Sequence, residues 1–328
     1  MNPPSLGVGK IRALETLADA NGVFHILAID HRDSLRVLLD PDDPESVPAQ
    51  RITDLKLTII REIAPLSTAV MLDPEYSISQ AIVSGALPGS VGFLSAIEEQ
   101  GYLGDPHARR TALLTGWGVE KAKRAGAGGI KFLIFYHPDA GEAAALQEEA
   151  VRAVVADCAR HDIPLFLEPM AYPLDPSVRP DSAEFGQHRP AVVIETARRL
   201  SALAPEVLKI QFPIDARYQP DPRAWDQACA QLDEACAVPW ALLSLGEPYE
   251  TFKKQLEVAC RHGCSGFMAG RALWREVVTA DPAQRPAMLR DLVAPRFQEL
   301  SAIARANGTS WKRRFNPPLV GDRWCRGY

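Results

Sequence analysis

Short apolar runs alternate with longer segments of helical periodicity along almost the whole chain. The runs are rich in β-branched and aromatic residues, as buried strands are, whereas the longer segments repeat apolar residues every three or four positions. The runs predict strands at residues 23–29, 68–72, 90–94, 129–135, 163–169, 206–213, 239–244 and 265–269. The longer segments predict helices at residues 11–20, 50–63, 78–84, 113–124, 142–161, 191–202, 222–235, 249–262 and 289–306, with Pro-containing loops at 40–48 and 172–190.

Strands that each lead into a helix, with short connections and no linker, predict one α/β domain, a single (β/α)8 TIM barrel over residues 1–308. No GxGxxG motif follows the first strand, which argues against a dinucleotide-binding fold. The segment 289–306 is predicted to be an extra C-terminal helix. The basic tail, residues 309–328, is expected to be either a loose tail or a strap on the barrel or on a neighbouring subunit.

Three apolar strands each carry an isolated charged residue. In the strand 206–213, Lys209 and Gln211 fall on one face by period-two alternation, and Leu208 and Ile210 fall on the other. A buried ammonium is costly, so Lys209 is expected to reach water, to pair with a carboxylate or to become a neutral amine. Lys131 lies in a second apolar strand and Glu168 ends a third. Together these three charges predict a functional site.

The ends of the other strands supply further polar residues. Active sites of (β/α)8 barrels lie at the carboxyl ends of the strands. This rule adds Asp30, Asp73, Ser244 and Arg271 to the same rim. Both aspartates have an equally plausible structural role, because Asp also caps helices and forms turns.

An anion cradle is expected after the seventh and eighth strands. It comprises Ser244, Gly246, Gly270 and Arg271. Loops at this position often bind phosphate through backbone N–H groups, and a guanidinium fits an oxyanion. Ordinary turn formation remains the alternative for these residues.

The composition narrows the class of protein. The chain has 328 residues, 47% of them hydrophobic, and a net charge of −5, which argues against a nucleic-acid partner. The six cysteines show no zinc-binding spacing, and no apolar run is long enough to span a membrane. The first ten residues do not resemble a signal peptide, so a cytoplasmic protein with reduced thiols is expected.

Two lysines and a carboxylate beside an anion cradle suggest Schiff-base chemistry on a phosphorylated carbonyl compound. One lysine would attack the carbonyl group, and the other would lower the pKa of the first by charge repulsion and help to hold the substrate. The carboxylate would move protons while a carbon–carbon bond breaks.

The same residues carry a family resemblance. The segments Ala28-Ile29-Asp30-His31-Arg32, Leu72-Asp73-Pro74-Glu75-Tyr76, Ile130-Lys131-Phe132-Leu133, Phe166-Leu167-Glu168, Val207-Leu208-Lys209 and Ala269-Gly270-Arg271-Ala272-Leu273-Trp274 resemble the class I tagatose 1,6-bisphosphate aldolases. From residue 239 to residue 297 the chain is equally similar to the related sulfofructose-1-phosphate aldolases.

This resemblance implies roles for named residues. Lys209 would form the imine and Glu168 would act as acid and base, while Lys131 and Asp30 hold or polarise the site. The residues expected to bind substrate are Asp73, Gln211, His31 and the four of the anion cradle. No cofactor or metal is required, because the protonated imine is the electron sink. Three residues depart from the usual pattern: His31 stands in place of Gln, Leu245 in place of a small residue and Glu247 in place of an apolar one.

The expected function is reversible cleavage of a ketose 1-phosphate or 1,6-bisphosphate, of the tagatose 1,6-bisphosphate type, to dihydroxyacetone phosphate and an aldehyde such as glyceraldehyde 3-phosphate. One alternative substrate is 6-deoxy-6-sulfofructose 1-phosphate, which gives sulfolactaldehyde. Another alternative is a metal-dependent enzyme using His31, His137 or His188 with Asp73, and a third is a non-catalytic sugar-phosphate sensor. The expected partner is the phosphorylated ketose, with homo-oligomers possible.

Overall fold

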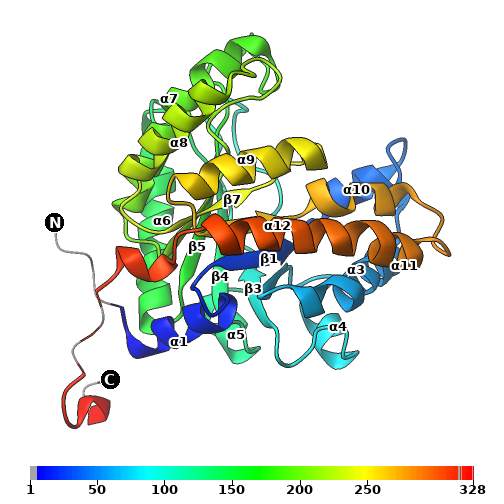
Figure 1. Ribbon diagram of the computed structural model, residues 1–328, viewed down its shortest axis with the longest axis horizontal. Helices are drawn as coiled ribbons and strands as arrows, with labels where there is room; N and C mark the ends of the chain where they lie inside the picture. The colour runs from blue at the N-terminus through cyan, green and yellow to red at the C-terminus, as the bar shows by residue number, and fades with distance from the viewer. Residues whose placement is uncertain (1–5, 317, 319, 327) are drawn as a thin grey trace.

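The computed structural model describes residues 6–316, 318, 320–326 and 328. Residues 1–5 of the predicted barrel domain, and 317, 319 and 327 of the predicted tail, lie outside these. The strands form a closed parallel barrel in sequence order, which confirms the predicted (β/α)8 fold (Figure 1). The strands are β1 (Phe24–Ala28), β2 (Ala69–Leu72), β3 (Gly92–Ala96), β4 (Gly129–Phe135), β5 (Leu165–Met170), β6 (Val207–Ile210), β7 (Trp240–Leu243) and β8 (Gly266–Ala269).

Helices surround the barrel. They are α1 (Val8–Leu17), α2 (Asp33–Leu39), α3 (Ala49–Ile63), α4 (Ile78–Val83), α5 (Val119–Arg124), α6 (Glu142–Arg160), α7 (Ala183–Ser201), α8 (Pro222–Ala235), α9 (Tyr249–Arg261), α10 (Arg271–Thr279), α11 (Arg285–Met288) and α12 (Ala294–Asn307). Among the described residues, no helix is both long and apolar enough to cross a membrane.

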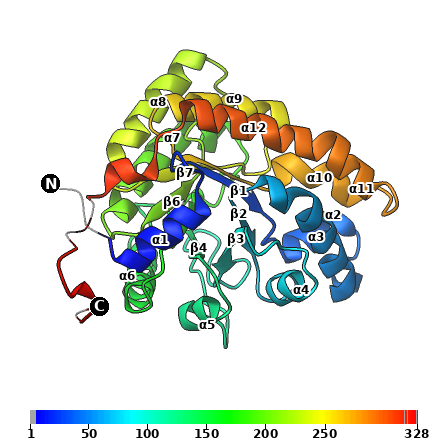
Figure 2. The same cartoon turned by 60° about the horizontal axis from the view of Figure 1, so that its bottom comes forward.

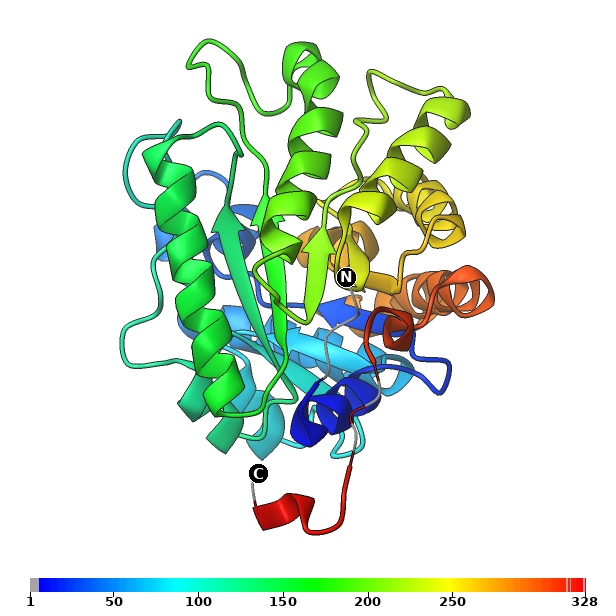
Figure 3. The same cartoon turned by 90° about the vertical axis from the view of Figure 1, so that its left-hand side faces the viewer.

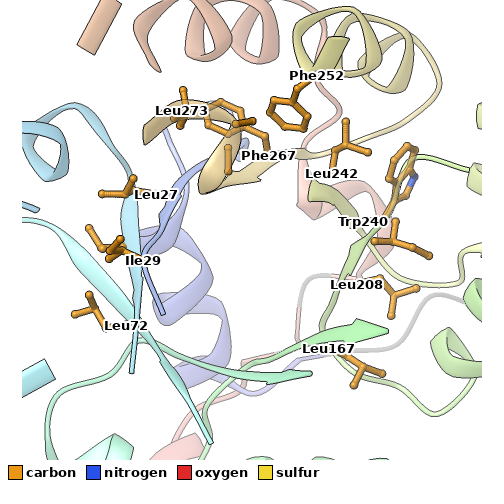
Figure 4. Packing of buried hydrophobic residues seen from close by; sticks show 14 of the residues in the cluster. Leu27, Ile29, Leu72, Leu167, Leu208, Trp240, Leu242, Phe252, Phe267 and Leu273 are labelled. Carbon is orange, nitrogen blue, oxygen red and sulfur yellow. The ribbon is translucent and has the colours of Figure 1, made fainter. Parts of the chain in front are cut away.

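Each strand divides its side chains between two cores. Leu208 and Ile210 of β6 belong to the larger core between strands and helices, where Figure 4 shows Leu208 beside Trp240 and Leu27 on the opposite side of the barrel. Since neighbouring side chains on a strand alternate, Lys209 points to the barrel interior. The same alternation turns Lys131 inward, because Ile130 and Phe132 also belong to the larger core. The alternation of side chains along β4 and β6 therefore places both lysines inside the barrel.

The amino ends of the strands are closed by α1 and by the first part of the tail. Leu14 and Leu17 of α1 are buried with Phe24 and Phe166 inside the barrel, and Figures 2 and 3 show α1 across this end. Trp311 joins the same core, and its backbone N–H donates to the carbonyl of Gly22 at 3.0 Å. Residues 309–315 thus lie on the barrel as a strap, and the opposite end is left for the site.

Several element boundaries differ from those predicted. The helix predicted at residues 191–202 begins at Ala183, because Ser182 caps it by accepting from the N–H of Phe185 and burial of Phe185 compensates for Pro190 inside the helix. The helix predicted at 113–124 begins only at Val119, and the third strand runs two residues beyond the predicted end.

The helices α2, α10 and α11 were not predicted. The first two begin two to five residues after a strand, where charged residues at the start of the helix conceal the helical pattern. The third, α11, has only four residues.

Candidate active site

A cavity of about 320 Å³ opens at the carboxyl ends of the strands. Leu243, at the end of β7, and Met268 of β8 form part of its wall. The wall also includes most of the residues predicted from the sequence, namely Asp30, His31, Lys131, Glu168, Lys209, Ser244, Gly246, Gly270 and Arg271. The parallel strands therefore bring together side chains that are up to 241 positions apart in the chain, from Asp30 to Arg271.

Lys209 has one carboxylate neighbour. Its Nζ lies 2.8 Å from Oε2 of Glu168 and 3.4 Å from Sδ of Met71, and the whole residue is 5% exposed. Both neighbours come from other strands, so the amine is fixed in the barrel interior. The sulfur is a weak acceptor, and Glu168 is the ionic partner of Lys209 in the described structure.

Lys131 has three carboxylate neighbours. Its Nζ lies 2.8 Å from Asp30 and 3.3 Å from Oε2 of Glu168, and it also pairs with Glu98. Burial alone would lower the pKa of Lys131, but these carboxylates raise it well above its ordinary value. Lys131 is therefore a fixed cation, and Lys209 is the better candidate for a nucleophilic amine.

Glu98 is a site residue that the sequence analysis missed. Burial raises the pKa of its carboxyl group, and Lys131 opposes that rise. Its Oε2 also accepts from the backbone N–H of Leu133 at 3.2 Å. Glu98 follows β3 by two residues, so the rule that found Asp30 would have found Glu98 had the third strand been placed two residues later.

Asp30 and His31 are both held in their deprotonated forms. Burial alone would raise the pKa of Asp30, but Lys131 and Lys209 together hold it far below its ordinary value. Burial lowers the pKa of His31 to about 3, and the positive charge of Arg271 acts in the same direction, against the attraction of Asp30. Asp30 is therefore an anion and His31 a neutral imidazole at physiological pH. The Nδ1 atom of His31 is buried without a hydrogen-bond partner among the described residues.

The anion cradle is assembled from the β7–α9 and β8–α10 connections. Residues 244–247 form a tight turn, in which the N–H of Glu247 donates to the carbonyl of Ser244 at 2.9 Å and Gly246 has a φ of +79°. The N–H of Gly270 donates to Oγ of Ser244 at 3.3 Å, which ties the two connections together. Arg271 begins α10 directly beyond them. These groups offer an oxyanion backbone dipoles and a guanidinium.

Comparison with known proteins identifies the family. The sequence signature described as DeoC/LacD family aldolase matches residues 24–276. The chain belongs to this family. It is an aldolase, a lyase that makes or breaks a carbon–carbon bond. The matched region contains every predicted site residue.

Curated relatives match this aldolase over nearly its full length. A tagatose 1,6-diphosphate aldolase of Streptococcus agalactiae is 30% identical, covering 93% of this chain and 98% of the relative. A tagatose 1,6-diphosphate aldolase of Staphylococcus epidermidis is 28% identical, with coverage of 93% and 98%.

Solved structures share the fold of this aldolase. A fructose-bisphosphate aldolase from Plasmodium falciparum has a TM-score of 0.69 at 15% identity, covering 94% of this chain and 99% of that chain. An archaeal fructose 1,6-bisphosphate aldolase has a TM-score of 0.55 at 18% identity, covering 88% and 98%.

Two residues predicted to bind substrate lie outside the cavity wall of the aldolase. Asp73 is fully buried, pairs with Lys56, and accepts from the backbone N–H of Tyr76 at 2.7 Å. Gln211 accepts from the N–H of Ala171 at 2.8 Å. Asp73 therefore forms the turn after β2, and Gln211 joins the ends of β5 and β6. Substrate binding by these two residues stays a prediction.

Leu245 and Glu247, the two residues of this turn that depart from the family pattern, differ in their relation to the cavity. Leu245 lines the cavity and has a φ of +47°, which is unfavourable for leucine. Glu247 is not part of the wall. Burial raises the pKa of Glu247, and the positive charges of Arg189 and Arg217 oppose that rise. Of the two residues, Leu245 contributes to the cavity wall and Glu247 does not.

Metal binding has no structural support in the part of the chain that the structure describes. No group of three or more His, Cys, Asp or Glu side chains there has the arrangement of a metal site. The carboxylates around the cavity are instead directed to Lys131.

Proposed function

We propose that this aldolase works through a Schiff base on Lys209 and cleaves tagatose 1,6-bisphosphate, or a ketose 1-phosphate of that type, to dihydroxyacetone phosphate and glyceraldehyde 3-phosphate. One observation carries the proposal: of the two lysines in the cavity wall, Lys131 is surrounded by three carboxylates and Lys209 contacts one. The curated relatives named tagatose 1,6-diphosphate aldolase support the choice of substrate.

The first half of the reaction forms the imine. Lys209 first passes its ammonium proton to Glu168, its ionic partner, and the neutral amine then adds to the C2 carbonyl of the ketose. The resulting carbinolamine must lose its hydroxyl group as water. Glu168, whose Oε2 lies 2.8 Å from Nζ of Lys209, supplies the proton for that water. The products of this half are a protonated imine on Lys209 and an ionised Glu168.

The second half breaks the C3–C4 bond. Asp30 is a weak base because Lys131 and Lys209 hold its pKa so low, so we assign the C4 hydroxyl proton to the newly ionised Glu168. The electron pair of the C3–C4 bond moves into the iminium group as the aldehyde leaves. Glu168 returns the proton to C3 of the enamine, and water releases dihydroxyacetone phosphate. Lys131 stays charged throughout and holds Asp30, Glu98 and Glu168 in place.

The two sugars considered as substrates differ in the group at their distal end. Tagatose 1,6-bisphosphate carries a phosphate there, and 6-deoxy-6-sulfofructose 1-phosphate carries a sulfonate, while both share the 1-phosphate and the C2 carbonyl. The ratio of kcat/KM for the two sugars measures the preference directly, and the account predicts that the bisphosphate is preferred.

Cleavage of tagatose 1,6-bisphosphate by matched lysine variants tests the proposal. Lys209→Met is expected to lose cleavage, because methionine fills the same space without an amine. Lys254→Met is the control, since Lys254 is exposed on α9. Full activity of Lys209→Met would refute the Schiff-base assignment, and loss of wild-type activity with a chelator would favour a metal-dependent reaction.

A further inference from the structure

A second guanidinium approaches the anion cradle from α10, one helical turn beyond Arg271. If Gly246 carried a Cβ atom, that atom would lie 3.4 Å from Nε of Arg271 and 3.4 Å from Nη2 of Arg275. Residues four positions apart share one face of a helix, so both side chains reach the same turn. Gly246 therefore lies between two cations.

Neither of these arginines forms an ion pair in the described structure, which is unusual for two like charges placed so close together. The acidic neighbour on α10, Glu276, is engaged by Arg296 of α12 at 2.9 Å. Burial and the charge of Arg275 together lower the pKa of Arg271, against the attraction of Glu168 and Asp30 in the cavity. An anion placed between the two guanidinium groups would relieve this repulsion.

The surroundings of the pair also favour an anion. Gly270 precedes α10 and provides no side-chain cap, so the positive end of the helix dipole at Arg271 is not offset by a capping side chain. Oγ of Ser244 lies in the same corner, held by the N–H of Gly270. The alternative is that Arg275, which is exposed, is only a solvated surface residue. That alternative does not account for its direction toward Gly246 and Arg271.

We propose that Arg275 is a second cation of the anion cradle, and that Arg271 and Arg275 together make the cradle prefer a phosphate dianion to a singly charged anion. This proposal rests on the proposed function, in which the cradle binds the phosphate of the ketose. Two guanidinium forks can bind different oxygens of one phosphate, and each such bond is charge-assisted. Arg275 thereby acts as a specificity residue at the rim of the cavity.

Methyl phosphate and methanesulfonate are suitable probes, because the first is mainly a dianion at pH 8 and mainly a monoanion at pH 5.5, whereas the second is a monoanion at both. Calorimetric titration of the wild type is expected to show tighter binding of methyl phosphate than of methanesulfonate at pH 8. Arg275→Gln is expected to reduce that preference roughly 10-fold or more, in line with the loss of one charge-assisted bond. The preference at pH 5.5 should change little.

Arg12→Gln is the matched control, because Arg12 is exposed on α1 at the opposite end of the barrel and its loss changes the net charge by the same amount. Arg275→Lys retains the charge without the fork, and it should keep part of the preference. The proposal is overturned if Arg275→Gln binds methyl phosphate as Arg12→Gln does, or if Arg275→Lys behaves like Arg275→Gln in a folded protein.

These titrations also separate this proposal from the proposed function. Methyl phosphate has no carbonyl group, so its binding does not depend on an imine. A protein that fails to form an imine but discriminates the probes through Arg275 contradicts only the Schiff-base assignment. A protein that forms the imine and shows no effect of Arg275→Gln contradicts only the role of Arg275.

Discussion

Replacement of Lys131 by methionine would leave Asp30, Glu98 and Glu168 without the cation that they share. All three carboxylates are at most 8% exposed, so water replaces little of the lost attraction. Removing one partner of a buried ion pair costs about 3–5 kcal/mol. We expect a loss of that size for Lys131→Met near pH 8, unless the carboxylates take up protons.

Proton uptake by the three carboxyl groups makes the loss of folding stability in Lys131→Met depend on pH. In the wild type, the lysines hold the pKa of Asp30 low, so its stabilising contribution is present above the unfolded pKa and is lost as the pH falls. In the variant, burial dominates and raises the carboxyl pKa values in the folded state, so stability falls as the pH rises. The wild-type contribution of Asp30 is constant above its unfolded pKa of about 4, so between pH 5.5 and pH 8.5 only proton uptake by the variant changes the gap. The gap then widens as the pH rises, by about 1.4 kcal/mol per pH unit for each proton that the folded variant binds in excess.

Denaturant titrations of the wild type and Lys131→Met from pH 5.5 to pH 8.5 measure this gap. Lys254→Met is the control, because it removes an exposed positive charge and should give a small difference at every pH. The reasoning is refuted if the gap for Lys131→Met stays constant with pH or stays below about 1 kcal/mol, since either result would mean that the carboxylates are hydrated in the folded protein.

Three further predictions concern other residues. Glu168→Gln should slow imine formation from dihydroxyacetone phosphate roughly 100-fold to 10,000-fold, measured by rapid quenching with borohydride, and an unchanged rate would remove Glu168 from the proton transfers. Because the pKa of His31 is about 3, His31→Gln should leave the shape of the activity profile between pH 5.5 and pH 8.5 unchanged, and loss of a titration step there would show that His31 ionises. Trp311→Ala should destabilise the protein by about 3–5 kcal/mol in denaturant titration, whereas a change below about 1 kcal/mol would mean that the strap contributes little.

The charged residues inside strands could be predicted from the sequence because a strand has an unambiguous side-chain period. Once 206–213 was placed as a strand, Lys209 had to oppose Leu208 and Ile210, and the barrel rule then gathered the other strand ends. These residues could be predicted from two things alone: the alternation of side chains along a strand, and the rule that the active site of a barrel lies at the carboxyl ends of its strands.

Residues whose role depends on a distant partner could not be assigned in this way. An aspartate that binds substrate and one that shapes a turn look alike in sequence, and the ion pair of Asp73 with Lys56 of α3 is visible only in the structure. Arg275 lies on a helix that was not predicted, and only the tertiary structure brings it to Gly246. A misplacement of the third strand by two residues was enough to hide Glu98.

The most direct test of the account is borohydride reduction of the protein in the presence of dihydroxyacetone phosphate, followed by peptide mapping of the modified lysine. The account predicts one adduct, on Lys209, in the wild type and in Lys254→Met, and none in Lys209→Met. An adduct on Lys131, or bound dihydroxyacetone phosphate with no adduct at all, would contradict the claim that Lys209 is the nucleophile.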